Sequence, residues 1–283
     1  MKKLYYRYEI REEYTHAVSS HYMHLRCIPI CNSIQQIYGK KVIVTPLDSL
    51  TEKKDGQGNI LLSCRINGLH TDCSVISEGI AFVDVNAMEK EILNPCYRYV
   101  TDHTRPDQAM ADFFRAECLP LLSGKQTDWE RVHVLMHELH SRFSYVSGMT
   151  TVDTTAAEAF ALGKGVCQDY AQCLIALCRL ADIPARYTAG FLLGEGATHA
   201  WVEIFDSGYW YGFDPTHDRV ISDDYIKVAH GRDALDCPLE KGVFYGTCGQ
   251  RQNIRVFVKE YVPAKVREKK NDRNSSICGT AGG

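Results

Sequence analysis

Three residues in the second half of the chain are of types that can share acyl-transfer chemistry: Cys167, His199 and Asp214. A thiol attacks a carbonyl carbon usefully only as a thiolate. It therefore needs a position that favours negative charge, a base, and a group that orients the base. Cys167 stands where a glycine-containing segment enters an apolar run typical of a buried helix, and the free N–H groups of a helix start favour an anion. We interpret Cys167 as the candidate nucleophile.

His199 and Asp214 belong to two neighbouring segments with the pattern of β-strands. Residues 206–208, Asp-Ser-Gly, predict a tight hairpin between them, which would bring His199 and Asp214 close together. Asp214 would then accept the imidazole N–H and hold its tautomer. Trp201 would lie on the same strand face as His199 and shield the ion pair from water. The oxyanion would be held by the backbone N–H of Cys167 and a second donor that the sequence does not identify.

Four separate blocks around these residues resemble the motif series of the bacterial transglutaminase-like superfamily, in the family's order Cys, His, Asp. The blocks are Gly165-Val166-Cys167-Gln168-Asp169-Tyr170-Ala171, Ala181-Asp182-Ile183-Pro184-Ala185-Arg186-Tyr187, Thr198-His199-Ala200-Trp201-Val202-Glu203 and Phe213-Asp214-Pro215-Thr216. Residues 224–233 are similar to the family too, and the first ~85 residues look like the β-rich N-terminal region of its bacterial members.

This resemblance implies an α+β fold with a papain-like catalytic part, in which a helix carrying the cysteine packs on an antiparallel sheet or barrel. It also implies Cys167, His199 and Asp214 as a catalytic triad in a cysteine protease or amidase. The substrate would be an amide bond of a peptide or protein, with no cofactor and no metal. The family includes peptidases, cross-linking transglutaminases, deglycosylating amidases and inactive scaffolds, and the fold does not choose among them.

Other residues near the motifs have simpler interpretations. Cys173 and Cys178 lie deep in the same predicted helix and are expected to be buried apolar residues. His217 and Asp218 follow the turn at Pro215 and are the alternative base and orienting group.

The first turn after Cys167 raises two further questions. Asp169 favours the helix start but would oppose a thiolate if its charge faced Cys167, so it is expected to point away or to bind substrate. Gln168 is interpreted as an ordinary first-turn residue, although its amide is a candidate oxyanion donor.

Three closely spaced histidines raise the question of a metal site. His133 and His137 would share a helical face, and His140 follows. The spacing of His137, Glu138 and His140 is one residue too short for the zinc-protease pattern, and no third ligand is evident. We expect no metal here.

Helices and strands that would position the site can be predicted from local signals. Thr127 with Glu130, and Thr155 with Glu158, are capping boxes that predict helix starts. A helix beginning at or beside Cys167 is expected to end before Pro184. Strands are expected at residues 186–193, 199–205, 209–213, 242–245 and 254–262.

The chain is expected to divide into a β-rich N-terminal domain at residues 1–90, a catalytic domain at residues 91–262 and a disordered tail at residues 263–283. Alternation around Tyr6, Tyr8 and Ile10 predicts the first strand. The N-terminal part contains no cluster of reactive side chains that is recognisable from the sequence.

Charge and composition exclude several classes of function. The formal net charge is −3, without a basic block in the folded part, which disfavours nucleic-acid binding. No segment approaches the ~18 apolar residues of a membrane helix, and the start lacks the apolar region of a signal peptide. We therefore expect a cytoplasmic protein whose twelve cysteines are free thiols. The sequence does not predict the oligomeric state.

The predicted function is hydrolysis of an amide or peptide bond through a thioester on Cys167. The alternatives are amine transfer by the same thioester, release of a glycosylamine, and a non-catalytic binding module on the same fold. An intact set of three residues argues against the last alternative.

Overall fold

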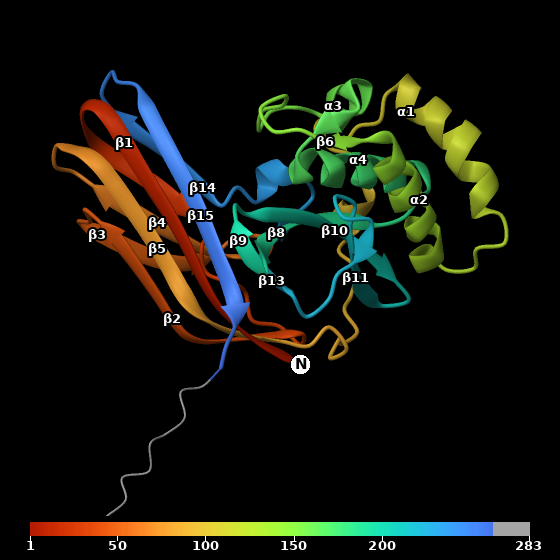
Figure 1. Ribbon diagram of the computed structural model, residues 1–283, viewed down its shortest axis with the longest axis horizontal. Coiled ribbons are helices and arrows are strands. Elements are labelled where there is room, and N and C mark those ends of the chain that lie inside the picture. Colours follow the sequence, from red (N-terminus) through yellow and green to blue (C-terminus); the bar gives the residue numbers. More distant parts are fainter. Residues whose placement is uncertain (263–283) are drawn as a thin grey trace, which may run out of the picture.

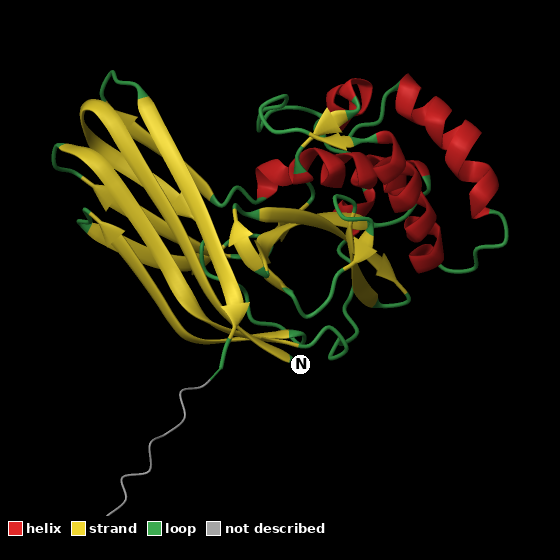
Figure 2. Cartoon of the chain, in the orientation of Figure 1, coloured by secondary structure: helices red, strands yellow, loops and turns green. Residues whose placement is uncertain are grey.

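The computed structural model describes residues 1–262, and the tail expected at residues 263–283 lies outside the described residues. A tall antiparallel β-structure occupies one side of the molecule, and the helices gather around a smaller sheet on the other (Figures 1 and 2). Two hydrophobic cores correspond to these two parts. No helix of the described part is long and apolar enough to cross a bilayer.

The larger sheet has eight strands. They are β1 (Lys2–Leu25), β2 (Gln35–Thr45), β3 (Ser49–Lys54), β4 (Ile60–Ile66), β5 (His70–Val83), β9 (Gly194–Gly196), β14 (Glu240–Tyr245) and β15 (Gln250–Glu260). The first arm of β1 pairs with β5 and β15, and its second arm pairs with β4 and β14. The alternating burial of Leu4, Tyr6, Tyr8 and Ile10 confirms the predicted first strand.

Three strands, β9, β14 and β15, lie elsewhere than the expected domain boundaries imply, and β9 joins the larger sheet by pairing with β15. β14 and β15 fall within residues 91–262, which the sequence assigns to the catalytic domain, yet both pair with β1 in the larger sheet. The pairing runs from Leu4 opposite Glu260 to Tyr14 opposite Gln250, so the end of the described chain completes the sheet that its beginning starts. Blue β15 beside red β1 shows this closure (Figure 1).

The smaller sheet has the strand order β12-β11-β10-β8-β13. Its strands are β8 (Ala185–Leu192), β10 (His199–Asp206), β11 (Tyr209–Asp214), β12 (Arg219–Val220) and β13 (Tyr225–Gly231). The predicted hairpin between β10 and β11 is confirmed: Ser207 and Gly208 both have positive φ, at 53° and 95°, as a tight turn between twisted strands requires.

The helices are α1 (Gln108–Phe113), α2 (Asp128–Arg142), α3 (Ala156–Leu162) and α4 (Cys167–Leu180). Both predicted capping boxes are present, at Thr127 for α2 and at Thr155 for α3. A parallel pair of short strands, β6 (Ser144–Tyr145) and β7 (Lys164–Gly165), joins the segments before and after α3. Single helical turns occur at Pro95–Arg98, Phe114–Cys118, Leu119–Leu122 and Ala234–Asp236.

α4 is the central helix of the second core. Its side chains from Asp169 to Cys178 are buried, and they pack against α2, α3 and one face of β8 and β10. Cys173 and Cys178 are fully buried, in line with their interpretation as apolar core residues. This packing determines where the first residue of α4 lies relative to the small sheet.

The opposite face of the small sheet packs on the larger sheet. Phe191 of β8 stacks on Tyr8 with ring centroids 5.3 Å apart and belongs to the N-terminal core. The side chain of Gln35 donates to the carbonyl of Lys227 at 2.9 Å and accepts from its N–H at 2.8 Å. The amide of Asn59 makes the same two-way contact with the backbone of His230. The two parts are therefore joined by both apolar and polar contacts.

Candidate active site

Cys167 is the first residue of α4, and local contacts place the helix start there. The carboxylate of Asp169 accepts the N–H of Val166 at 2.7 Å and the hydroxyl of Thr150 at the same distance. A Cβ on Gly165 would lie 2.4 Å from the Asp169 carboxylate, so glycine is required at this close approach. Asp169 thus holds both the backbone just before Cys167 and the loop that contains Thr150.

The N–H groups at the start of α4 remain directed at the space beside Cys167. The carbonyl of Val166 accepts from Asp169 and Tyr170, whereas the N–H groups of Cys167 and Gln168 have no acceptor within the helix, as at any helix start. Together with the helix dipole, they favour negative charge at this point. This is the environment that a thiolate or an oxyanion needs.

His199 begins β10 and Asp214 ends β11, and the hairpin brings their side chains together. Nε2 of His199 and Oδ2 of Asp214 are 2.8 Å apart. The imidazole is 10% exposed and the carboxylate is completely buried. The structure therefore brings together the two residues that the sequence pairs as base and orienting group.

The thiol of Cys167 completes this arrangement. Burial lowers the pKa of His199, but the hydrogen bond with Asp214 and the nearby Cys167 outweigh it, and the net effect raises the pKa to about 9. Because Asp214 occupies Nε2, the other ring nitrogen of His199 is left for the thiol. Cys167 itself is partly exposed, as a nucleophile must be to meet a substrate.

Asp214 has more donors than the sequence reveals. Its Oδ2 also accepts from Nδ1 of His217 and from the hydroxyl of Tyr225, each at 2.7 Å. Its Oδ1 accepts the N–H groups of Thr216 and His217. Burial opposes ionisation, but the hydrogen bonds and the charge of His199 hold the pKa of Asp214 well below its usual range. Asp214 is therefore an anion that can stabilise an imidazolium.

Tyr225 is the functional candidate that sequence reasoning missed. Nε of Arg219 donates to the hydroxyl of Tyr225 at 2.7 Å, which in turn donates to Asp214. The resulting chain leads from Arg219 through Tyr225 and Asp214 to His199. Residues 224–233 resemble the superfamily in sequence, but nothing in that pattern relates Tyr225 to Asp214, because the contact depends on how β13 pairs in the sheet.

His217 and Asp218 do not pair with one another. His217 donates to Asp214, whereas Asp218 pairs with His137 of α2 at 2.7 Å. His140 of the same helix contacts the carbonyl of Pro215 at 2.9 Å. These contacts secure the turn after Asp214 against α2 and do not form a second base and orienting group.

The α2 histidines have separate partners. His133 packs edge-on against Trp129 and Phe213, whereas His137 and His140 contact the turn after Asp214. A different set, His199, Asp214 and His217, has donor atoms within 4.8 Å of one another, as a metal site would. Its imidazoles already share the Asp214 carboxylate, which fits a proton-bearing hydrogen-bond network.

A buried ionic cluster lies further along β10, on the same face of the strand as His199 and Trp201. Glu203 accepts from Arg186 at 2.6 Å and from Lys227 at 2.5 Å, and all three side chains are at most 7% exposed. Arg186 also stacks on Trp210 at 3.8 Å. Burial opposes the charge of Glu203, but its two cationic partners keep its pKa low. The cluster braces β8, β10 and β13.

Trp201 lies between this cluster and His199, as the alternation of β10 predicts. Its ring is 1% exposed and stacks on His199 with centroids 6.5 Å apart. Tyr225 lies beside both rings, edge to face against the indole and with its centroid 6.1 Å from that of His199. The indole thereby screens one side of the imidazole from water.

The segment at residues 146–154 is tied to the start of α4. The side chain of Gln168 donates to the carbonyl of Val152 at 3.2 Å, and that of Gln172 donates to the carbonyl of Thr154 at 3.0 Å. The amide of Gln168 is thus engaged with this loop. Burial and the nearby Cys167 and Asp169 raise the pKa of Tyr145, the last residue of β6 before this segment.

Comparison with known families assigns two parts of the chain. Residues 118–215 match the Transglutaminase-like superfamily, and residues 4–81 match the Bacterial transglutaminase-like N-terminal region. The first match contains Cys167, His199 and Asp214. The expected relationship to transglutaminase-like proteins is confirmed.

Relatives match across most of the chain. An uncharacterized protein of Mycobacterium tuberculosis (strain ATCC 25618 / H37Rv) is 27% identical over 278 residues, with 85% of this chain and 87% of the relative covered. An uncharacterized protein of Mycobacterium leprae (strain TN) is 26% identical over 246 residues, with 78% and 85% covered.

A solved structure shares the fold. The crystal structure of a "putative cysteine protease" from Cytophaga hutchinsonii superimposes with a TM-score of 0.75 at 21% identity, covering 93% of this chain and 92% of that chain. The expected fold, a transglutaminase-like core of papain-like type with a β-rich N-terminal region, is confirmed.

Proposed function

We propose that this chain, which joins a transglutaminase-like core to a bacterial transglutaminase-like N-terminal region, hydrolyses amide or peptide bonds with Cys167 as nucleophile. In this proposal His199 is the acid and base, and Asp214 orients it. The observation that carries the proposal is the hydrogen bond of 2.8 Å between His199 and Asp214, with the pKa of His199 raised in part by the nearby Cys167, which begins a buried helix.

The first half of the reaction forms a thioester. His199 takes the proton of Cys167, and Sγ attacks the carbonyl carbon of the substrate, whose oxygen becomes an oxyanion. The N–H of Cys167 and the dipole of α4 would stabilise that oxyanion. As the carbonyl re-forms, the C–N bond breaks and His199 gives its proton to the leaving amine.

The second half returns the enzyme to its starting state. His199 takes a proton from a water molecule, whose oxygen attacks the thioester carbon, and Sγ leaves as the C–S bond breaks. The products are a carboxylic acid and an amine, and the net reaction consumes one water molecule. Asp214 stays ionised throughout and stabilises the imidazolium that forms twice in the cycle.

A labelling experiment tests the nucleophile without knowledge of the substrate. Alkylation by iodoacetamide would be followed at each cysteine by peptide mass spectrometry, in the wild type and in His199→Ala. Cys248 is a matched control, because it is a partly exposed free thiol outside the site. We expect Cys167 to react roughly tenfold or more faster than Cys248, and His199→Ala to abolish that difference.

The outcome that would overturn the proposal is equal reactivity of Cys167 and Cys248 in both proteins. The fold would then serve a non-catalytic binding role. If Cys167 is activated, a peptide and amide library in ¹⁸O-labelled water identifies the acceptor. Label in the acid product supports hydrolysis, whereas unlabelled product with incorporated amine would make the protein a transferase.

A further inference from the structure

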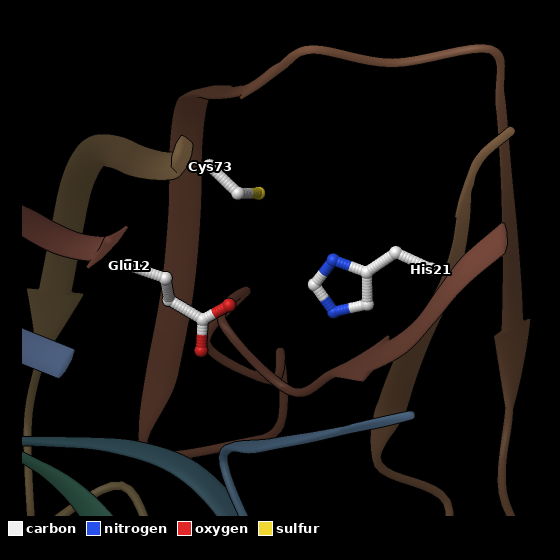
Figure 3. A group of neighbouring side chains, drawn as sticks. All are labelled: Glu12, His21 and Cys73. Atoms are coloured by element: carbon white, nitrogen blue, oxygen red, sulfur yellow. The ribbon is translucent and has the colours of Figure 1, made fainter. Parts of the chain in front are cut away.

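A second group of chemically active side chains lies in the larger sheet, far from Cys167 in the fold. Glu12 and His21 come from the two arms of β1, and Cys73 comes from β5 (Figure 3). All three are buried, with relative exposures of 3%, 2% and 2%. The sequence gives no sign of this cluster, because the spacings between these residues fit no known metal-binding pattern.

A bend in β1 brings the three residues together. Glu12 and Cys73 face one another as cross-strand partners, and the pairing of β1 with β5 then shifts register between Glu13 and Val18. Ser20 has a φ of 48°, in the left-handed region. Irregularities of this kind redirect the following side chains. The bend turns His21 back over the pair formed by Glu12 and Cys73.

The donor atoms of the cluster converge. One carboxylate oxygen of Glu12, one ring nitrogen of His21 and the sulfur of Cys73 lie within 4.8 Å of one another. The three side chains point toward a common space, and the edge of the His21 ring that carries its nitrogens faces the other two residues (Figure 3). In a tetrahedral zinc site the donor atoms are roughly 3.5 Å apart, so a small inward movement would bring three of the four ligands into place and leave the fourth position to another donor or to water.

The charge of Glu12 has no cationic partner among residues 1–262. Its hydrogen bonds come from the Tyr14 hydroxyl at 2.5 Å and from the side-chain amides of Gln250 and Gln252 at 3.0 Å each, all of them neutral. The amide of Gln252 also donates to the carboxyl group of Glu240, a second acidic side chain beside Glu12 and not a cationic one. Neutral donors satisfy the oxygens of a buried carboxylate but do not cancel its charge.

We propose that Glu12, His21 and Cys73 bind a divalent transition-metal cation, with zinc as the best fit. The cation would supply the positive charge that the buried carboxylate lacks. A sulfur, a nitrogen and an oxygen donor together favour zinc over magnesium or calcium, which prefer oxygen alone. Binding would release the thiol proton of Cys73 to solvent and leave a zinc–thiolate bond.

His70 is positioned to support the site. Its ring stacks on His21 with an interplanar angle of 5°, and its Nε2 lies 3.4 Å from Nδ1 of His21. It can hold the ring of His21 in place, as hydrogen-bond partners of metal-binding histidines commonly do. The site would join both arms of β1 to β5.

Cobalt(II) is a suitable probe, because its binding to a thiolate gives a charge-transfer band that zinc then abolishes by displacement. The full chain, stripped with a chelator, would be titrated as wild type, Cys73→Ala, Cys27→Ala and Cys167→Ala. Cys27 is the matched control, a fully buried cysteine of the same core, and Cys167→Ala silences the thiol of the candidate active site.

The expected result is one cobalt ion per chain with a thiolate band in the wild type, Cys27→Ala and Cys167→Ala. In Cys73→Ala the band should be lost and the affinity should fall by roughly a hundredfold. A band lost in Cys167→Ala but kept in Cys73→Ala would place the metal at the other site and overturn the proposal. Absence of binding by the wild type would do so as well.

A second variant guards against misfolding of Cys73→Ala. Glu12→Gln keeps the size of the side chain and removes its charge, so it should keep the thiolate band and bind cobalt roughly tenfold more weakly. Unchanged affinity in Glu12→Gln would contradict the role given to its carboxylate. None of these readouts depends on catalytic activity.

Discussion

Buried carboxylates at three named positions of the two parts differ in their partners. In the transglutaminase-like core, Asp214 meets His199 and Glu203 meets two cationic side chains. In the larger sheet, Glu12 meets only hydroxyl and amide donors. Burying a charge is costly unless it is paired. Asp214 and Glu203 therefore have counter-charges within the core, whereas Glu12 has none in the described part of the sheet, in line with the proposed cation from solution.

The first prediction tests the charge at Asp214, where the largest effect is expected. Asp214→Asn should lower kcat by roughly 10,000-fold, because a neutral amide neither holds the required tautomer of His199 nor stabilises the imidazolium. The assay is turnover of the best substrate from the library screen, with the fold checked by circular dichroism.

Asp218→Asn is the matched control for this substitution. Asp218 is a nearby carboxylate that pairs with His137 on the surface of α2 and does not touch His199. Its substitution should leave kcat nearly unchanged. Equal losses in both variants would mean that Asp214 acts through the local fold and not through His199.

The second prediction compares one substitution in the two parts of the molecule. Glu203→Gln should lower the free energy of unfolding by about 3–5 kcal/mol, because it leaves two buried cations without their anion. Urea denaturation at pH 7 measures this change. Burial and Arg186 already lower the pKa of Lys227 to about 8, so the loss should shrink above that pH as Lys227 releases its proton.

Glu12→Gln is the corresponding change in the larger sheet. With a chelator present, it removes a charge that has no cationic partner, so stability should change by no more than about 1 kcal/mol. A loss as large as that in Glu203→Gln would contradict the contrast between the two regions. Zinc should then stabilise the wild type more than Glu12→Gln.

The third prediction concerns pH. The pKa of His199 is raised from its ordinary 6.5 to about 9, so kcat/KM should fall as pH rises through about 9 and the imidazolium loses its proton. The stability of the folded protein depends on this proton in the same direction, and it also falls as pH rises. The contribution of this proton is fully present below about pH 6.5 and is lost as pH rises through about 9.

The measurement is the alkaline limb of kcat/KM, together with proton NMR of the imidazole. Asp214→Asn removes a main cause of the raised pKa, so the NMR titration of His199 in this variant should move toward lower pH. An alkaline limb near pH 6.5 in the wild type would show that His199 does not hold its proton as the contacts with Asp214 and Cys167 require.

The smallest expected effect belongs to Tyr225. Tyr225→Phe removes one hydrogen bond to Asp214 while keeping the ring that packs on Trp201. We expect kcat to fall roughly tenfold with KM unchanged, because the hydroxyl positions Asp214 and does not touch substrate. Tyr211→Phe, on β11, should leave both constants unchanged. A rise in KM alone would contradict the positioning role.

Residues close to a local signal were predictable from the sequence. Cys167 follows a glycine and begins an apolar helical run, and His199 and Asp214 flank a recognisable hairpin. The capping boxes at Thr127 and Thr155 likewise predict helices that the structure contains. Each of these predictions needs only a short stretch of sequence, because the physical cause is a contact within one element or between neighbouring strands.

Residues brought together by distant pairing were not predictable in this way. Tyr225 reaches Asp214 only because β13 pairs with β8, and Glu12 meets His21 only because β1 bends. Likewise, β14 and β15 have ordinary strand patterns, and nothing local shows that they pair with the first strand. In each case the contact depends on the register between separated segments, which a single sequence does not encode locally.

The pairing of β1 with β15 also has a consequence for synthesis. β1 is made before the other described elements, yet the strand that covers it from Leu4 to Tyr14 is made after all of them. Contacts between such distant segments form slowly, because the long intervening chain must first be brought to order. During translation the apolar side of β1 therefore stays without its final neighbour while α4 and the small sheet can already assemble. A ribosome-bound chain would thus hold a nascent core beside an unfinished sheet, whose open edge is the segment most exposed to mispairing with another chain.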